Sequence, residues 1–183
     1  MTIKIGAKGN HAHVGLARIL GALLCTASVG VAAEDISRFN ELPISELSFS
    51  ASQWNRAHIK QDGSRNTVDI DQRGHAHQAE LMQYGKANQM RLTQGGIYNT
   101  ATVEQLGYAN TAAINQMGQQ NVADTVQWGE ENEIAISQYA DGGYATVHQH
   151  GVGNTALVEQ HVRGVRTHLT QFGNGSLIIV GQQ

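Results

Sequence analysis

The 183-residue chain has little of what usually holds a small exported or globular protein together. It has one cysteine, Cys25, so no disulfide can form within it. It has one proline, Pro43, and only 5% of its residues are aromatic. Aromatic side chains contribute much of the buried area of an ordinary core. These absences disfavour a disulfide framework and a large conventional core.

The first 33 residues are typical of a secretory signal peptide. Three basic residues precede an apolar run over 19–31, and small residues lead up to Ala33. The run is too short to span a membrane. We therefore expect residues 1–33 to be a signal cleaved after Ala33. Cleavage would remove Cys25 and leave nine Lys and Arg against fifteen Asp and Glu. This net charge of −6 disfavours non-specific nucleic-acid binding.

Glutamine recurs at every eleventh position over most of the chain. Twelve of the 18 glutamines share this one register, without insertion or deletion. They are Gln61, Gln72, Gln83, Gln94, Gln105, Gln116, Gln127, Gln138, Gln149, Gln160, Gln171 and Gln182. With one further unit starting at Ser50, the repeat region covers residues 50–182. Such a period indicates a repeat architecture.

Other positions of the eleven-residue unit recur as well. Two residues after the glutamine position stands a glycine in nine of twelve units: Gly63, Gly74, Gly85, Gly96, Gly107, Gly118, Gly129, Gly151 and Gly173. Five residues after it stands an asparagine in eight units: Asn55, Asn66, Asn88, Asn99, Asn110, Asn121, Asn132 and Asn154. Alanine usually stands seven residues after the glutamine position, and an aliphatic residue usually stands nine residues after it. The unit reads Q-x-G-x-x-N-x-A-x-(I/V/L)-x-Q.

The spacing within the unit predicts strands. An eleven-residue period also suits a right-handed helical supercoil. The recurring positions, however, lie two apart, which is the alternation of a β-strand. We expect an all-β fold, a cross-β solenoid of strand–turn–strand rungs. Each unit would be one strand of about six or seven residues followed by a turn, with glycine supplying the positive φ that the turn needs. Twelve units would make six 22-residue repeats.

Side chains 22 residues apart would then lie above one another in the stack. Buried Gln and Asn amides could hydrogen-bond along such columns as ladders. A buried amide without a partner costs about 1–3 kcal/mol. A slip by one residue would turn every inward side chain outward. Both effects explain why the glutamine spacing is kept so strictly. At one asparagine position stands His77, which we expect to point inward in its place.

The unit resembles the repeat of the curlin family, the subunits of bacterial curli amyloid fibres. The resemblance covers residues 50–182, although five 22-residue repeats are usual in the family and six are present here. Residues 34–49, outside the repeats, resemble the leader that directs curlins to their outer-membrane secretion channel. The resemblance implies export through the periplasm to the cell surface and fimbrium, with this channel and its accessory factors as partners. It implies no cofactor and no enzymatic activity.

Within this family the chain most resembles the minor subunit, which nucleates the major curlin. The tripeptide NEL at 40–42 and the divergent last units carry this resemblance, with Arg163 and Arg166 adding charge near the end. In the last strand we expect Leu177 and Ile179 to point outward and Ile178 and Val180 inward. The resemblance implies templating of fibres at a rung edge, in support of adhesion and biofilm formation.

Two alternatives remain open. The chain could be a major curlin, which polymerises with itself. It could also be a monomeric β-solenoid that binds ice or polysaccharide. Ice binding needs a regular outward array of identical residues, such as threonine. Thr67, Thr100, Thr111 and Thr155 share one outward position, but Arg56, Glu133 and other residues interrupt the array. A soluble solenoid also needs capping ends, and none is visible after Gln182.

No grouping of residues points to catalysis or to a resident metal. The glycines are placed for turns, and no Ser–His–Asp set recurs. His148 and His150 would face outward on one strand, but no cysteine and no regularly placed carboxylate accompanies them. Five residues that follow a repeat glutamine, 22 apart, should form an outward stripe: Tyr84, Leu106, Trp128, His150 and Phe172.

Overall fold

The structure, a computed structural model, describes residues 2–6, 12–18 and 54–183. The predicted cleavage site after Ala33, the predicted leader 34–49 and the start of the first unit at 50–53 lie outside the described residues, and these boundaries stay predictions. Within the described ranges no helix has the length and hydropathy needed to cross a membrane.

The described chain is built from strands. They are β1 (Thr2–Gly6), β2 (Ala12–Arg18), β3 (Arg56–Ser64), β4 (Thr67–His75), β5 (Gln78–Lys86), β6 (Gln89–Ile97), β7 (Thr100–Tyr108), β8 (Thr111–Gln119), β9 (Val122–Glu130), β10 (Glu133–Gln138), β11 (Tyr144–Val152), β12 (Thr155–Gln160), β13 (Arg166–Asn174) and β14 (Leu177–Gln182). From β3 onward, each consecutive pair of strands makes one rung.

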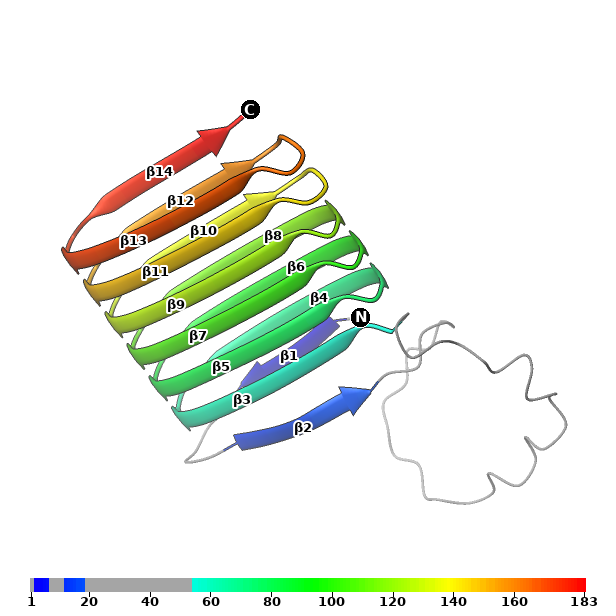
Figure 1. The fold of residues 1–183 in the computed structure, drawn as a ribbon. Helices are drawn as coiled ribbons and strands as arrows, with labels where there is room; N and C mark the ends of the chain where they lie inside the picture. The colour runs from blue at the N-terminus through cyan, green and yellow to red at the C-terminus, as the bar shows by residue number, and fades with distance from the viewer. Residues whose placement is uncertain (1, 7–11, 19–53) are drawn as a thin grey trace, which may run out of the picture.

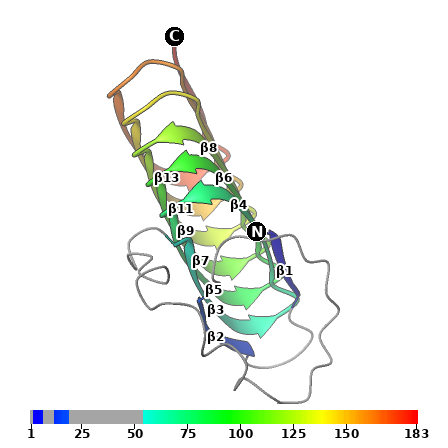
Figure 2. The same cartoon turned by 90° about the vertical axis from the view of Figure 1, so that its right-hand side faces the viewer.

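The rungs stack into two facing seven-stranded sheets (Figure 1). One sheet has the order β1-β4-β6-β8-β10-β12-β14 and is called the even-numbered sheet after its repeat strands. The other has the order β13-β11-β9-β7-β5-β3-β2 and is called the odd-numbered sheet. From β3 to β14 all pairing is parallel, and each residue pairs with the residue 22 positions further on, as Gln83 does with Gln105. The turned view shows the two layers edge-on (Figure 2). The predicted β-solenoid of six 22-residue rungs is confirmed.

The two ends of the stack differ. At the first rung, β1 pairs antiparallel with β4 and β2 pairs antiparallel with β3. At the last rung, β13 pairs with β11 and β14 with β12, and neither has a second neighbour among the described strands. The stack therefore has one edge covered by β1 and β2 and one open edge, which lies at the C-terminal end in Figure 1.

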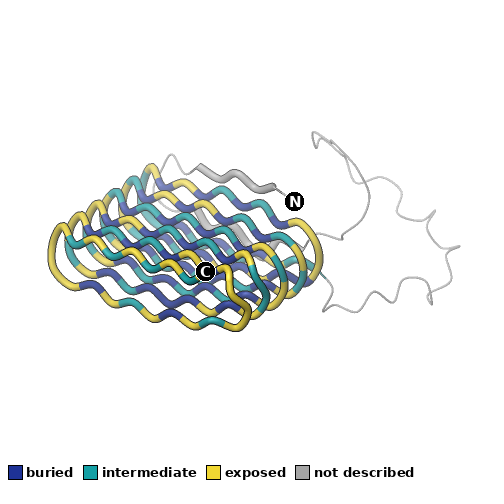
Figure 3. The backbone as a smooth tube through the Cα atoms, turned by 90° about the horizontal axis from the view of Figure 1, so that it is seen from above, coloured by how far each residue is buried: buried dark blue, intermediate teal, exposed yellow. Residues whose placement is uncertain are grey.

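Burial alternates along most of the repeat strands from β3 onward (Figure 3). In β7, for example, Ala101, Val103 and Gln105 point into the space between the sheets, and the intervening residues face out. The inward alanine and aliphatic side chains of successive rungs form one apolar core. This core is thin, and it is built without any aromatic side chain. Small residues suit it because the two sheets of each rung lie close together.

Strand length and glycine position differ from the sequence-based expectation. Most repeat strands have nine residues rather than six or seven, because the pairing continues past the glycine. These glycines have φ of 105–131° and lie near the ends of their strands. The left-handed turn residue comes two positions later, as at Ala87 with φ of 61°. Where Ala140 or Val162 replaces the glycine, β10 and β12 stop at the glutamine.

Candidate functional site: amide ladders and the open rung edge

The repeat glutamines form two continuous columns of hydrogen bonds. Each Nε2 donates to the Oε1 of the glutamine 22 residues on, at 2.7–3.0 Å, from Gln61 to Gln171 in one column and from Gln72 to Gln160 in the other. Nε2 also donates to a backbone carbonyl of the opposite sheet, as Gln105 does to Gln89 at 3.0 Å. The glutamines are thus buried with their donors satisfied, and they link rungs and sheets together.

The glutamine columns have a direction. Every Nε2 points toward the C-terminal rung, so the first rung presents an acceptor. Gln61 Oε1 is buried there and has no hydrogen-bond partner among the described residues. At the other end Gln160 reaches Gln182 Oε1 only at 3.5 Å, and Thr167 Oγ1 bridges the two glutamines at 2.8 and 3.0 Å. On its β14 side the terminal rung is therefore held by a longer glutamine contact than the interior rungs, whereas on its β13 side Gln149 still donates to Gln171 at 2.7 Å.

The asparagine columns pair chiefly with the backbone, rather than amide to amide. Asn88 Oδ1, for example, accepts from the backbone N–H of Asn110 at 3.0 Å, and its Nδ2 donates to the carbonyl of Gly107 at 3.2 Å. Direct amide–amide hydrogen bonds occur along one column, where the Nδ2 of Asn110, Asn132 and Asn154 each donates to the Oδ1 of the asparagine 22 residues earlier. Each asparagine thus fixes the turn of its own rung to the turn of the next.

The two asparagine columns end differently. One runs from Asn66 through Asn88, Asn110, Asn132 and Asn154 to the N–H of Ser176. The other passes from Asn55 through His77, Asn99 and Asn121 and stops at the N–H of Gly143. The next residue of this column, 22 positions after Gly143, is Val165, whose side chain has no amide group. One edge of the last two rungs therefore lacks the amide ladder.

His77 takes the place of an asparagine in the second column. It is fully buried; its Nδ1 accepts from the backbone N–H of Asn99 at 3.2 Å, and its Nε2 lies 3.0 Å from the carbonyl of Arg73. These partners require a neutral ring with the proton on Nε2. Burial lowers the pKa of His77 below its ordinary value of 6.5, and the charge of His75 acts in the same direction.

Acid is expected to destabilise the stack through His77. Because its folded pKa is lowered, the unfolded chain binds a proton first. The contribution of the neutral ring is therefore complete above pH 6.5 and is lost as pH falls from there toward the folded pKa, by up to about 1.4 kcal/mol per pH unit. His77→Asn should remove this part of the dependence. Denaturant unfolding at pH 7.5 and 5 measures it; His150→Asn, at an exposed position on another rung, is the control. If the free energy of unfolding falls by the same amount between pH 7.5 and pH 5 in wild type and in His77→Asn, then His77 is not the source of this pH dependence.

The repeat glycines permit close approach of successive rungs. A Cβ added to Gly107 would overlap the carbonyl oxygen of Gly129 in the next rung. The same overlap with the next glycine carbonyl holds for Gly63, Gly74, Gly85, Gly96, Gly129 and Gly151. The carbonyl of Gly129 accepts from Asn110 Nδ2 at 2.9 Å. Glycine and asparagine of the unit therefore form one connected turn structure.

The outer face of the odd-numbered sheet carries the aromatic stripe. Leu106, Trp128 and Phe172 are well exposed there. The ring of His150 packs between those of Trp128, at 6.1 Å between centroids, and Phe172, at 6.3 Å. Tyr84 belongs to the same column and is half-buried. A shallow groove runs beside the stripe, with Val126 and His148 on its other side.

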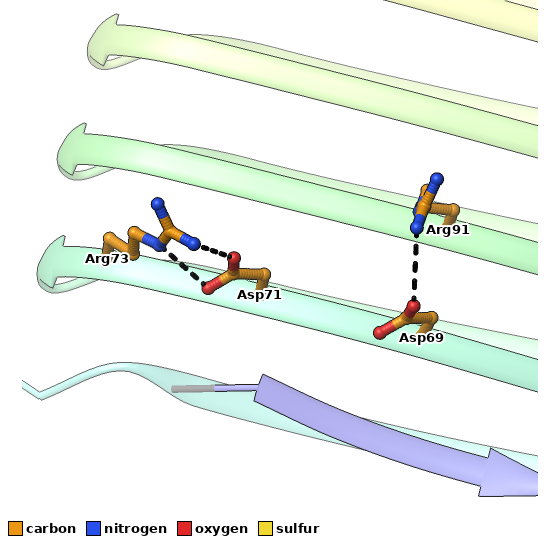
Figure 4. Close-up of polar contacts among 4 residues, drawn as sticks. All are labelled: Asp69, Asp71, Arg73 and Arg91. Atoms are coloured by element: carbon orange, nitrogen blue, oxygen red, sulfur yellow. Dashed lines mark hydrogen bonds and ion pairs between the residues drawn. The ribbon is translucent and has the colours of Figure 1, made fainter.

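The outer face of the even-numbered sheet carries ion pairs in its first two rungs (Figure 4). Arg73 lies 2.7 Å from Asp71 on the same strand, and Arg91 on β6 lies 3.7 Å from Asp69 on β4. Both arginine side chains are more than 70% exposed. Exposed pairs contribute at most about 1 kcal/mol. They add solubility to the first rungs more than stability.

The last rung presents apolar side chains beside its open backbone edge. In β14, Leu177 and Ile179 point outward and are 63% and 65% exposed, while Ile178 and Val180 are half-buried on the inner side. β14 carries no charged residue. Arg163 lies in the turn before β13, and Arg166 begins β13 with its guanidinium 6.0 Å from the ring centre of Tyr144.

Comparison with known proteins points to the same repeat. The family described as curlin associated repeat matches residues 63–96 and 129–161. These segments run from the end of β3 into β6, and from the end of β9 to just past β12. No curated protein and no solved structure matches the chain. The repeat matches support the curlin family, which is associated with extracellular curli fibres, and they suggest a structural protein rather than an enzyme.

Proposed function

We propose that this curlin-repeat chain is the minor curlin subunit, which nucleates polymerisation of the major curlin into curli fibres at the cell surface. Nucleation is a templating event at the backbone edge of the last rung. Fibres started in this way would serve adhesion and biofilm formation. The chain would reach the surface through the periplasm and the curli secretion channel, guided by residues 1–33 and 34–49.

The observation that carries this proposal is the open edge of β13 and β14. Both strands end the stack, with no further neighbour among the described residues. Edge strands of this kind pair readily with another chain unless charge, proline or a covering element blocks them. β14 has none of these, and its sequence LIIVGQ is apolar on both faces. An incoming strand with the same eleven-residue unit would continue the 22-residue register.

A preformed edge removes the slow step of fibre formation. A free chain must close its first rung before any stacked contact stabilises it, so the entropy of loop closure precedes the gain. A rung that is already folded offers backbone partners and a glutamine column at once. One chain can then start a fibre of many copies, which is the behaviour of a nucleator.

The proposal is tested by the kinetics of fibre formation. A freshly unfolded major curlin of the same organism is followed by thioflavin-T fluorescence, with and without substoichiometric amounts of residues 34–183. We expect this segment to abolish the lag phase. If the lag is unchanged while residues 34–183 form fibres readily alone, the chain is a major subunit. If neither happens, the chain is a solenoid that binds another ligand.

Two matched variants locate the templating edge. Ile179→Lys places a charge on the outward face of β14, and Ala135→Lys places the same charge in the same column on β10, two rungs inside the stack. We expect Ile179→Lys to restore most of the lag, because charge on an edge strand opposes pairing. Ala135→Lys should leave seeding intact. Equal effects of the two would place templating away from the last rung.

A further inference from the structure

Two histidines face each other across the last pair of odd-numbered strands. The register pairs His148 with Thr170 and Thr146 with His168, so the two histidines are diagonal neighbours on the outer face of β11 and β13. Their ring centroids are 5.9 Å apart, and the ring planes are inclined by 78°. His168 is exposed and His148 half-exposed, so solvent reaches both rings.

These two imidazoles differ from the others nearby in their surroundings. His150 packs between Trp128 and Phe172, and His161 stacks on Tyr139 at 5.0 Å. Stacking of this kind holds a ring in place. His148 and His168 have each other as ring neighbours, and the Nε2 of His168 has only a long 3.5 Å contact with Thr170 Oγ1. Their nitrogens are therefore available to an added ligand.

The separation of the rings suits a shared metal ion. A histidine nitrogen binds a zinc-like ion at about 2.0–2.1 Å, so two rings on one ion have centres about 5.2 Å apart at a tetrahedral angle and at most about 6.4 Å apart in line. The observed 5.9 Å lies between these values, and rotation of the side chains would bring the rings closer to the tetrahedral spacing. Imidazole favours copper, nickel and zinc over hard cations such as calcium or magnesium. Of the first-row divalent ions, copper binds such nitrogen sites most tightly.

The charges on this face are mixed. Asp124 lies in the same column as His168, two rungs toward the N-terminus, and Glu104 lines the groove beside His148. Arg166 precedes His168 on β13, but its guanidinium is directed toward Tyr144. No group of three or more His, Cys, Asp or Glu within the described ranges is arranged to hold a metal ion. Any site here has two protein ligands and is completed by water.

We propose that His148 and His168 form a two-histidine surface site for a first-row divalent ion, Cu²⁺ most tightly and Zn²⁺ more weakly. The site joins β11 to β13 and so ties the last rung to the rung before it. The bound ion adds a link on the outer face of β11 and β13, beside the inward hydrogen bond from Gln149 to Gln171. The metal thereby stabilises the open edge without being part of the solenoid core.

The site is tested by calorimetric titration of CuCl₂ into the folded full chain in a non-coordinating buffer. We expect one class of sites to weaken at least tenfold in His148→Asn and equally in His168→Asn, with no further loss in the double variant. His150→Asn, two residues away on the same strand, is the matched control and should bind as the wild type does. Loss in His150→Asn but not in His168→Asn would replace the pair by His148 and His150, and so overturn the proposal. Unchanged binding in both His148→Asn and His168→Asn would overturn it too.

A second readout separates a specific site from loose binding. With ZnCl₂, amide hydrogen exchange over residues 166–183 should slow severalfold in the wild type, because the ion ties β13 to β11. His148→Asn should show no such slowing, although His168 is still present. Slowing that is equal in both proteins would show that the ion does not bridge the two strands.

Discussion

Replacing Gly107 by alanine is expected to destabilise the stack more than any other single-methyl change considered. The residue has φ of 126°, and an added Cβ would overlap the carbonyl oxygen of Gly129 in the next rung. Backbone strain of about 1–3 kcal/mol and overpacking of about 1–3 kcal/mol would add to about 4 kcal/mol. The neighbouring rungs cannot relieve it, since every one repeats the same contact. Denaturant unfolding followed by circular dichroism measures the loss.

Gly153→Ala is the matched control. Gly153 has φ of 64°, but no atom lies within 4 Å of a Cβ added to it. Seven turns already carry a non-glycine residue at the equivalent left-handed position, among them Ala76, Ala87 and Ala109. We expect a loss of about 1 kcal/mol. If both variants lose the same amount, positive φ alone would explain the glycines, and the close approach of rungs would not.

Replacing Gln105 by leucine is expected to have the second largest effect. The change leaves the Nε2 of Gln83, the Oε1 of Gln127 and the carbonyl of Gln89 without their partner, all in the interior. Each orphaned buried group costs about 1–3 kcal/mol, and burial of the leucine side chain offsets about 1.5–3 kcal/mol of the sum. A net loss of about 3 kcal/mol is therefore expected in the free energy of unfolding. The leucine adds apolar surface but cannot satisfy any of these groups.

Two further variants check that the ladder is the cause. Gln89→Leu changes an exposed side chain on the outer face of β6 and should alter stability by less than about 0.5 kcal/mol. The double variant Gln83→Leu with Gln105→Leu interrupts the glutamine column over two rungs. It leaves few more amides without a partner than either single variant does, because the two glutamines are partners of each other. Its loss should therefore be clearly smaller than the sum of the two single losses. Additive losses would mean that the glutamines contribute independently and not as a column.

The arrangement of the strands could be predicted from the sequence because the repeat encodes its own register. A glutamine at every eleventh position, with asparagine, alanine and aliphatic residues two apart, specifies both the inward face and the 22-residue stacking distance. The amide of Gln83, for example, meets another glutamine amide on both sides only when its strand is stacked between those of Gln61 and Gln105, which stand 22 residues before and after it. Helical alternatives conflict with that alternation, so the residues alone favour the solenoid.

Other features depend on geometry that the residue types do not encode. The backbone partners of Asn88 follow from the shape of the turn, not from the identity of the next asparagine. The glycines were expected at the turn itself, but they lie at the ends of the strands, because the positive φ is needed where rungs approach most closely. The contact between His148 and His168 is diagonal across strands. Along the sequence, His148 and His150 look like the closer pair.

The common direction of the glutamine hydrogen bonds sets the symmetry of any assembly. Each donor faces the last rung and each acceptor the first, where Gln61 Oε1 has no partner in the described part of the chain. If two copies were joined through their first rungs, a glutamine acceptor of one copy would face a glutamine acceptor of the other. A two-fold dimer of stacks is therefore disfavoured. A heterologous contact between unlike ends keeps the direction, leaves the same pair of ends free and does not close. Cleavage of the predicted signal, residues 1–33, would also remove β1 and β2 from the first rung. The molecule's own polarity would then favour an open, one-directional filament.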